Sequence, residues 1–206
     1  MIFYRTLDHI FSSYSSIAVL RALQYVNKGL SGREISRNAG ITPRSALNAL
    51  TNLENFKIVN RTIGGRDHIF NLNRNNYLVK NGILPLLESE TNFLPEILSL
   101  IKRKLSKKTL SIILFGSVAR KQEEVQSDLD ICLVIINKSI QKDVEKTKSD
   151  LFDIISEKYG TTLGVIILTK DEFRKRGRKN LSPVNNIIKE GKVISGKPIK
   201  LLLHGT

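Results

Sequence analysis

Two segments decide the fold of the second half of this chain: Leu114-Phe-Gly-Ser-Val-Ala-Arg120 and Ser127-Asp-Leu-Asp-Ile-Cys-Leu-Val134. An apolar run ends at Gly116-Ser117, and ten residues separate Ser117 from Asp128. A glycine at a strand end lets the backbone approach a phosphate, and a serine opening a helix adds a hydroxyl where N–H groups already point outward. Asp128 and Asp130 lie two apart on a predicted strand, so both carboxylates project from one face, with Cα atoms roughly 6.5–7 Å apart. Such a pair can share Mg²⁺, which takes its other ligands from water and substrate phosphates.

The order strand, Gly-Ser, helix, strand with Asp-x-Asp resembles the signature of the minimal nucleotidyltransferases, distant relatives of the polymerase-β superfamily. The resemblance covers residues 104–197, about half of the chain. It implies an α/β fold (α+β overall for the whole chain) with a small mixed sheet, and it implies ATP or another NTP as ligand, with Mg²⁺ or Mn²⁺. The implied catalytic and metal-binding residues are Asp128 and Asp130, and the implied nucleotide-binding residues are Gly116, Ser117 and Arg120. The alternative is that the two acids only face solvent and that Gly116-Ser117 is only a turn.

The third predicted strand, residues 163–168, departs from this family. Active members usually carry a third carboxylate there, but the aligned position is Gly164, and Asp171 and Glu172 fall where the next helix begins. Two-metal phosphoryl transfer holds the attacking and leaving oxygens between two ions. With two acids, binding of an NTP through one ion is expected, and catalysis is left open. The residue after Arg120, often glycine in the family, is Lys121.

The composition favours a polyanionic partner. The net charge is +14, and the parts before and after Pro85 each carry +7. Such an excess is typical of proteins that bind nucleic acid or nucleotide phosphates, although a lysine-rich proteome would explain part of it. A single cysteine, Cys132, predicts a small core residue in a reducing, cytoplasmic setting. No apolar run approaches the roughly 18–20 residues that span a bilayer, so no membrane association is expected.

Three helices are predicted in the first part of the chain. The first spans residues 15–27 and ends before Gly29. The second is capped by Ser31, with Glu34 completing a capping box, and it ends at Gly40. The third begins at Thr42-Pro43, where proline's missing N–H costs nothing. It runs to about residue 55, with these residues predicted on its inner face: Ala46, Leu47, Leu50 and Leu53.

Two strands follow, at residues 57–63 and 68–72, joined by the hairpin signal Gly64-Gly65-Arg66-Asp67. Two short helices with a tight turn and then a hairpin resemble the winged-helix DNA-binding domains of transcription regulators, over residues 14–73. The resemblance implies contacts with double-stranded DNA from the third helix and the wing. The implied residues are Arg44, Ser45, Asn48 and Asn52 on the helix, and Arg61, Arg66 and His68 on the wing. The alternative is a winged helix used only as a protein–protein scaffold.

The interval 77–105 shows helical periodicity and joins the two parts. The expected organisation is a winged-helix domain at 1–76, a helical connector at 77–105 and a nucleotidyltransferase-like domain at 106–206. Because two-fold DNA sites favour two-fold proteins, a homodimer is predicted, with the connector as its interface. A connector that only links the domains is the equal alternative.

Residues 174–179 hold five basic side chains in six positions, which could meet DNA, RNA or the nucleotide tail, or could be a solvated face. Three hypotheses for the whole chain remain. The first is a DNA-binding protein whose second domain binds NTP-Mg and transfers a nucleotidyl group to a hydroxyl. The second is a non-catalytic transcriptional regulator that only senses nucleotide. The third is a toxin-neutralising nucleotidyltransferase that modifies a partner protein.

Overall fold

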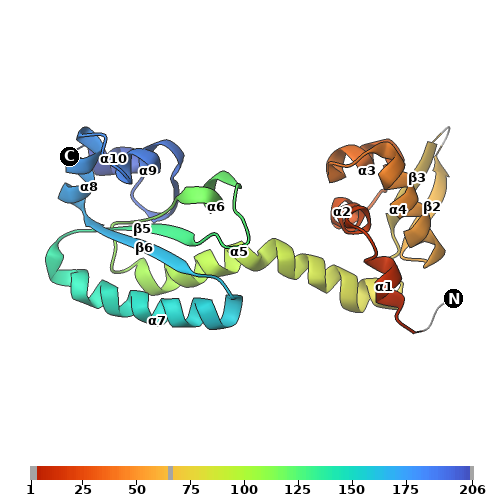
Figure 1. Ribbon diagram of the computed structural model, residues 1–206, viewed down its shortest axis with the longest axis horizontal. Coiled ribbons are helices and arrows are strands. Elements are labelled where there is room, and N and C mark those ends of the chain that lie inside the picture. The colour runs from red at the N-terminus through yellow and green to blue at the C-terminus, as the bar shows by residue number, and fades with distance from the viewer. Residues whose placement is uncertain (1–3, 65–66, 205–206) are drawn as a thin grey trace. The chain divides into compact units, whose positions relative to one another are not determined.

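The computed structural model describes residues 4–64 and 67–204. These residues form two compact units that divide between Asn92 and Phe93. Each unit combines helices with a small sheet, so the predicted mixed α/β class is confirmed (Figure 1). Within the described ranges, no helix is both long and apolar enough to cross a membrane.

The first unit contains a three-stranded antiparallel sheet in the order β1-β3-β2. Its helices are α1 (Thr6–Ile10), α2 (Tyr14–Leu23), α3 (Gly32–Ala39) and α4 (Pro43–Asn55), and its strands are β1 (Leu30–Ser31), β2 (Val59–Gly64) and β3 (Asp67–Leu72). The helices and the sheet share one apolar core that includes Leu20, Ile35 and Leu50. The turn residues Gly65 and Arg66 lie outside the described residues.

The predicted helix caps are confirmed. Ser31 and Glu34 form the reciprocal capping box of α3, which ends at Gly40 in the left-handed conformation. The Thr42 side chain accepts a hydrogen bond from the N–H of Ser45 at the start of α4. The predicted end of the first helix is wrong, because α2 ends at Leu23 and not at residue 27.

The inner face of α4 also differs from the prediction, because Leu47 is 54% exposed and Ala49 is buried in its place. The buried set 46, 49, 50 and 53 follows the i, i+3, i+4, i+7 spacing of one helix face. Leu47 lies about 100° around the helix from Ala46, and therefore points outward.

The predicted connector is helical throughout. A π-helical segment, η1 (Val79–Ile83), leads into α5 (Leu84–Leu105), which contains Pro95. Leu87, in the first part of α5, joins the core of the first unit, whereas Ile101, in its last part, joins a core of the second unit. The helix therefore contributes apolar side chains to each unit separately.

The second unit is built on a mixed four-stranded sheet in the order β6-β5-β4-β7. Strand β4 pairs antiparallel with both neighbours, and β5 pairs parallel with β6. The strands are β4 (Ser111–Leu114), β5 (Leu129–Ile135), β6 (Leu163–Thr169) and β7 (Lys192–Gly196). The helices after α5 are α6 (Gly116–Arg120), a 3₁₀ turn η2 (Lys138–Ile140), α7 (Gln141–Tyr159), α8 (Lys170–Arg178), α9 (Val184–Glu190) and α10 (Ile199–Leu203).

Helices cover both faces of this sheet (Figure 1). Along β5, Leu129, Ile131 and Leu133 pack in a core with α7 and the last part of α5. Cys132 and Val134, which alternate with them, pack in a separate core with α8, α9 and α10. Cys132 is fully buried, and this burial raises the pKa of its thiol to about 12. The thiol is therefore an inert core group, as the sequence indicates.

Candidate functional site

The site is centred on the corner between β4 and α6. Phe115 is extended, and Gly116 then takes a φ of 76° at the first position of α6. A side chain cannot fit there, because a Cβ on Gly116 would lie 3.0 Å from the Cγ of Asp130 and closer still to its Oδ2. The glycine is therefore required both for its backbone conformation and for the close approach of Asp130.

Asp130 faces this corner because of the alternation along β5. Odd-numbered residues of the strand point to the α7 side, so Asp130 points to the side of the sheet that carries α8 to α10. Asp128 immediately precedes the strand, rather than lying within it. Its Cβ and the Oδ1 of Asp130 both lie within 4 Å of the place where a Cβ on Gly164 would be. The Asp128 side chain and the Asp130 carboxylate therefore lie beside the same position on β6.

The electrostatics of the pair favour a cation. The pKa of Asp130 is raised, first because the half-buried carboxyl loses hydration and second because Asp128 repels its charge, while Arg120 acts in the opposite direction. Asp128 is exposed. A positive charge placed between them would relieve the repulsion that raises this pKa.

Gly164 occupies the position beside the pair on the next strand. In the parallel register of β5 and β6, Asp130 lies opposite Gly164, and a Cβ there would be 2.8 Å from the Oδ1 of Asp130. Asp171 and Glu172 lie in the first turn of α8, where Glu172 completes a capping box with Thr169. In the described part of the chain, no group of three His, Cys, Asp or Glu side chains could hold a metal ion. Of the described residues, Asp128 and Asp130 are thus the two that bring carboxylates to this corner.

Arg120 lies at the end of α6 and is held by an acid that the sequence did not single out. Its Nη1 donates to Glu190 Oε1 at 2.6 Å, and its Nε donates to Gln122 Oε1 at 3.1 Å. Glu190 ends α9, 70 residues further along the chain, so pattern and spacing gave no signal for this pair. Lys121 follows with a φ of 59°, a left-handed conformation that explains why glycine suits this position.

The residues predicted to contact DNA have different environments in the first unit. Arg44 and Asn48 are exposed on α4, whereas Ser45 accepts a hydrogen bond from the Thr42 hydroxyl at 2.9 Å. The Asn52 amide donates to the main-chain oxygen of His9 at 2.8 Å, so it links α4 to α1.

On the hairpin, Arg61 forms a 3.1 Å ion pair with Glu54 of α4, and His68 is exposed on β3. Arg66 lies outside the described residues. Sequence analysis missed a polar hollow of about 280 Å³ beside α4, which four serines line together with residues of α4. The lining residues are Ser12, Ser13, Ser15, Ser16, Ser45, Asn48, Ala49 and Asn52.

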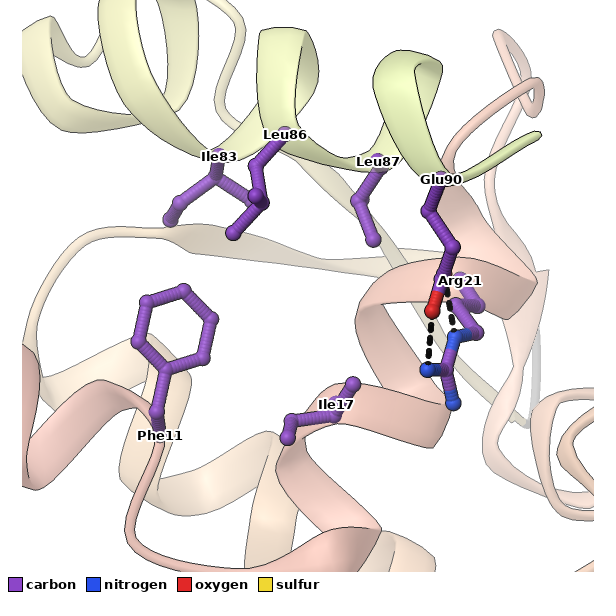
Figure 2. A pocket seen from close by; sticks show the side chains of 7 residues that line it. All are labelled: Phe11, Ile17, Arg21, Ile83, Leu86, Leu87 and Glu90. Carbon is purple, nitrogen blue, oxygen red and sulfur yellow. Dashed lines mark hydrogen bonds and ion pairs between the residues drawn. The ribbon is translucent and has the colours of Figure 1, made fainter. Parts of the chain in front are cut away.

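The first unit also contains an apolar pocket of about 320 Å³ between α2 and the η1–α5 helix (Figure 2). Arg21 and Glu90 close one side with two hydrogen bonds of 2.6 and 2.5 Å. This bond to Arg21 holds the pKa of Glu90 below its ordinary value. The other lining residues are Phe11, Ile17, Ile83, Leu86 and Leu87. Leu86 is 59% exposed although its neighbours are apolar.

Comparison with known proteins identifies the class of the second unit. Residues 94–194 match the nucleotidyltransferase domain family, and the chain belongs to this family. A relative from Methanocaldococcus jannaschii, named as a protein adenylyltransferase, is 31% identical over 107 residues, which are 52% of this chain and 98% of the relative.

Two solved structures show weaker similarity. A toxin–antitoxin structure with AMP-PNP is 18% identical over 54% of this chain and 79% of its own, with a TM-score of 0.33. A mutant of ZitR from Lactococcus lactis in its apo form is 13% identical over 72% of this chain and 86% of its own, with a TM-score of 0.30. Both TM-scores lie well below 0.5, so neither similarity establishes a shared fold.

Proposed function

We propose that the second unit binds the triphosphate of ATP or another NTP at the corner of β4 and α6. The observation that carries this proposal is the approach of Asp130 to Gly116, which brings a carboxylate pair and a backbone corner together. The free N–H groups at Gly116 and Ser117 and the Ser117 hydroxyl suit phosphate oxygens. Arg120 adds positive charge at the end of the same helix.

Asp128 and Asp130 would hold one divalent cation, Mg²⁺ or Mn²⁺. The donor set fits a single ion, because Mg²⁺ is commonly held by one or two carboxylates together with waters and substrate phosphates. When bound, the ion neutralises and orients the triphosphate. The roles of the chain's own residues are distinct: Gly116 admits the phosphates, Ser117 donates to them, and the two acids would hold the ion.

Transfer of a nucleotidyl group is the reaction that this arrangement supports. An acceptor hydroxyl would attack the α-phosphorus in line, and pyrophosphate would leave. The relative named as a protein adenylyltransferase supports AMP as the transferred group and a hydroxyl on a protein as the acceptor. A toxin-neutralising role would be one instance of this chemistry.

Incubation with α-labelled ATP, Mg²⁺ and a lysate of the source organism tests this function. We expect label to appear in an acceptor with wild-type protein and to be lost with Asp128→Ala, because one of two metal ligands is removed. Lys142→Ala, at an exposed position of α7, is the control and should label normally. Labelling that survives Asp128→Ala would exclude this corner as the site of transfer.

A second function, nucleotide sensing without turnover, is favoured by Gly164. Because a glycine stands beside Asp130 where a third carboxylate would lie, the site suits one ion better than a two-ion clamp. ATP would then bias the protein between two states through different affinities for them. Saturable ATP binding with no labelled acceptor and no pyrophosphate release would support this function over transfer.

We further propose that residues 14–73 form a winged helix that binds double-stranded DNA. The order of α2, α3, α4 and the β2–β3 hairpin supports this assignment. Arg44 and Asn48 are exposed on α4 and could reach base edges, and exposed Leu47 could contact a thymine methyl group. The serines beside α4 could donate to phosphates, while Asn52 would first have to release His9.

Selection from a random DNA duplex library is expected to enrich a site that Arg44→Ala binds more weakly. The loss should be about 1–3 kcal/mol, with relaxed preference at one guanine, because a bidentate arginine contact is removed. Lys80→Ala, which removes the same charge from an exposed position of η1, should leave that preference intact. If both variants lose affinity equally for every sequence, α4 does not read bases.

We propose that two copies of the chain pair through α5. Leu86 is exposed beside the apolar pocket on this helix, and a second copy of the same surface would cover both. We expect Leu86→Glu to convert a dimer to a monomer in sedimentation without unfolding it, since the side chain is outside the core. Glu88→Lys, at an exposed position about 160° around α5 from Leu86, should leave the dimer intact. A wild-type monomer at micromolar concentration would exclude this interface.

A further inference from the structure

The positive charge of the second unit is concentrated in its last layer. Residues 170–204 contain ten lysines and arginines but three acids, whereas residues 93–169 contain twelve against ten. The last segment forms α8, α9, β7 and α10, and its three helices lie together on one side of the sheet (Figure 1). The excess is therefore carried by this layer, rather than by the whole unit.

The acids of this segment are already engaged. Glu172 accepts from the N–H of Thr169 in its capping box, which lowers the pKa of Glu172, and Glu190 holds Arg120. Asp171 forms a long ion pair with Arg174, with 3.9 Å between its Oδ1 and the Arg174 Nη1. Eight other basic side chains of this segment are exposed, and in the described part of the chain no acid lies within 4.0 Å of them. Two of them, Lys197 and Lys200, follow β7. We call the other six the basic face: Lys175, Arg176, Arg178, Lys179, Lys189 and Lys192.

The basic face extends from α8 toward the nucleotide corner, with Lys189 and Lys192 at the end nearer to it. Gly177 packs so closely on α9 that a Cβ there would lie 3.2 Å from Ile188, and α9 then ends at Glu190, which holds Arg120. On β7, Lys192 lies opposite Leu114, two residues before Gly116. Asp130 points to this same side of the sheet. Contacts therefore link α8 to α9 and α9 to Arg120, whose charge acts on Asp130.

We propose that the basic face binds the phosphate backbone of a nucleic-acid duplex, apart from any contact made by α4. Uncompensated lysines and arginines at adjacent surface positions are suited to repeated phosphates. The single Phe, Tyr or Trp residue of this segment, Phe173, is fully buried. Without an exposed ring to stack on bases, the face is suited to a paired backbone and not to unpaired bases.

A 20-bp blunt RNA duplex is the probe that isolates this face in the full-length protein. The major groove of A-form RNA is too deep and narrow for an inserted helix, so α4 cannot read it. We expect binding that is independent of sequence and weakens steeply with salt. Asp130→Asn should bind the duplex as well as wild type, which separates this proposal from nucleotide transfer.

Charge reversal provides the matched comparison. Arg176→Glu combined with Lys179→Glu should weaken binding about 10- to 100-fold at 0.1 M salt and reduce the salt slope by about two. Lys142→Glu combined with Lys146→Glu, exposed on α7 across the sheet, changes the net charge equally and should alter affinity by less than about threefold. Equal losses in the two double variants, or none in the first, would overturn the proposal. Competition by poly-glutamate at equal charge concentration would also overturn it, in favour of an acidic protein partner.

Discussion

Replacing Asp130 with asparagine is expected to abolish magnesium-dependent ATP binding while leaving the second unit at least as stable as before. The amide keeps the volume that packs against Gly116 but removes half of the charge that would hold a cation. Loss of a secondary metal contact typically costs 10- to 100-fold in affinity, so loss of a direct ligand should cost roughly 100-fold or more. Calorimetric titration with ATP and Mg²⁺ measures the effect.

The difference in stability between this variant and wild type should depend on pH in a defined direction. Burial and Asp128 raise the pKa of Asp130 above its ordinary 3.8, so the folded chain binds this proton more tightly than the unfolded chain. The contribution of wild-type Asp130 to stability is therefore present below pH 3.8 and is lost as pH rises through the raised pKa. The amide of Asp130→Asn does not titrate, so the variant does not lose stability in this way as pH rises.

Thermal unfolding at two pH values checks that sign. At pH 7 the Tm of Asp130→Asn should be higher than that of wild type. At pH 3.5 the two Tm values should lie closer together. A variant that is less stable than wild type at pH 7 would show that the ionised carboxylate supports the fold. Normal ATP binding by Asp130→Asn would exclude Asp130 as a metal ligand.

Replacing Gly116 with alanine should damage both the fold and the site. A non-glycine residue at a φ of 76° costs about 1–2 kcal/mol. The new Cβ would also meet the Asp130 carboxylate, which must move or force the backbone to move. We expect a total loss of about 2–4 kcal/mol in the free energy of unfolding and at least a 10-fold loss in ATP affinity.

Two other glycines of the same unit separate these effects. Gly160 has a φ of 62° with nothing within 4 Å of an added Cβ, so Gly160→Ala should show the backbone cost with normal ATP binding. Gly164 has no positive φ, but its Cβ would lie 2.8 Å from Asp130 Oδ1, so Gly164→Ala should weaken ATP binding with little backbone cost. If Gly116→Ala and Gly160→Ala behave alike in denaturation and in ATP titration, the packing of Asp130 against Gly116 has no role in function.

Much of the fold follows from short-range features of the sequence. The capping boxes at Ser31 and Thr169 and the αL glycines at 40 and 160 mark helix ends within a few residues. Alternation along β5 places Asp130 on the face of the sheet opposite to the apolar residues that pack on α7. These features are local, because hydrogen bonds and side-chain direction within a turn or a strand depend on neighbouring residues.

The end of α2, which was predicted wrongly, depends on tertiary packing. Residues 24–27 continue a helical pattern in the sequence, but the chain leaves α2 at Leu23 to reach β1, which pairs with β3. Intrinsic propensity is a weak preference that such pairing overrides. Leu47 has a large apolar side chain of the kind found in cores. Which face of α4 turns toward the core is set by packing against the neighbouring elements, and that packing buries Ala49 instead.

By itself, the sequence determined that one strand–helix–strand unit contains Gly116, Ser117, Asp128 and Asp130, because all four lie within a stretch of 15 residues. The tertiary structure alone decided what surrounds them. It placed Gly164 opposite Asp130 through a parallel register, paired Arg120 with Glu190, and brought the basic face to the same side of the sheet. These contacts join residues separated by 34 to 70 positions, and their formation depends on how the whole sheet pairs and which face each helix covers.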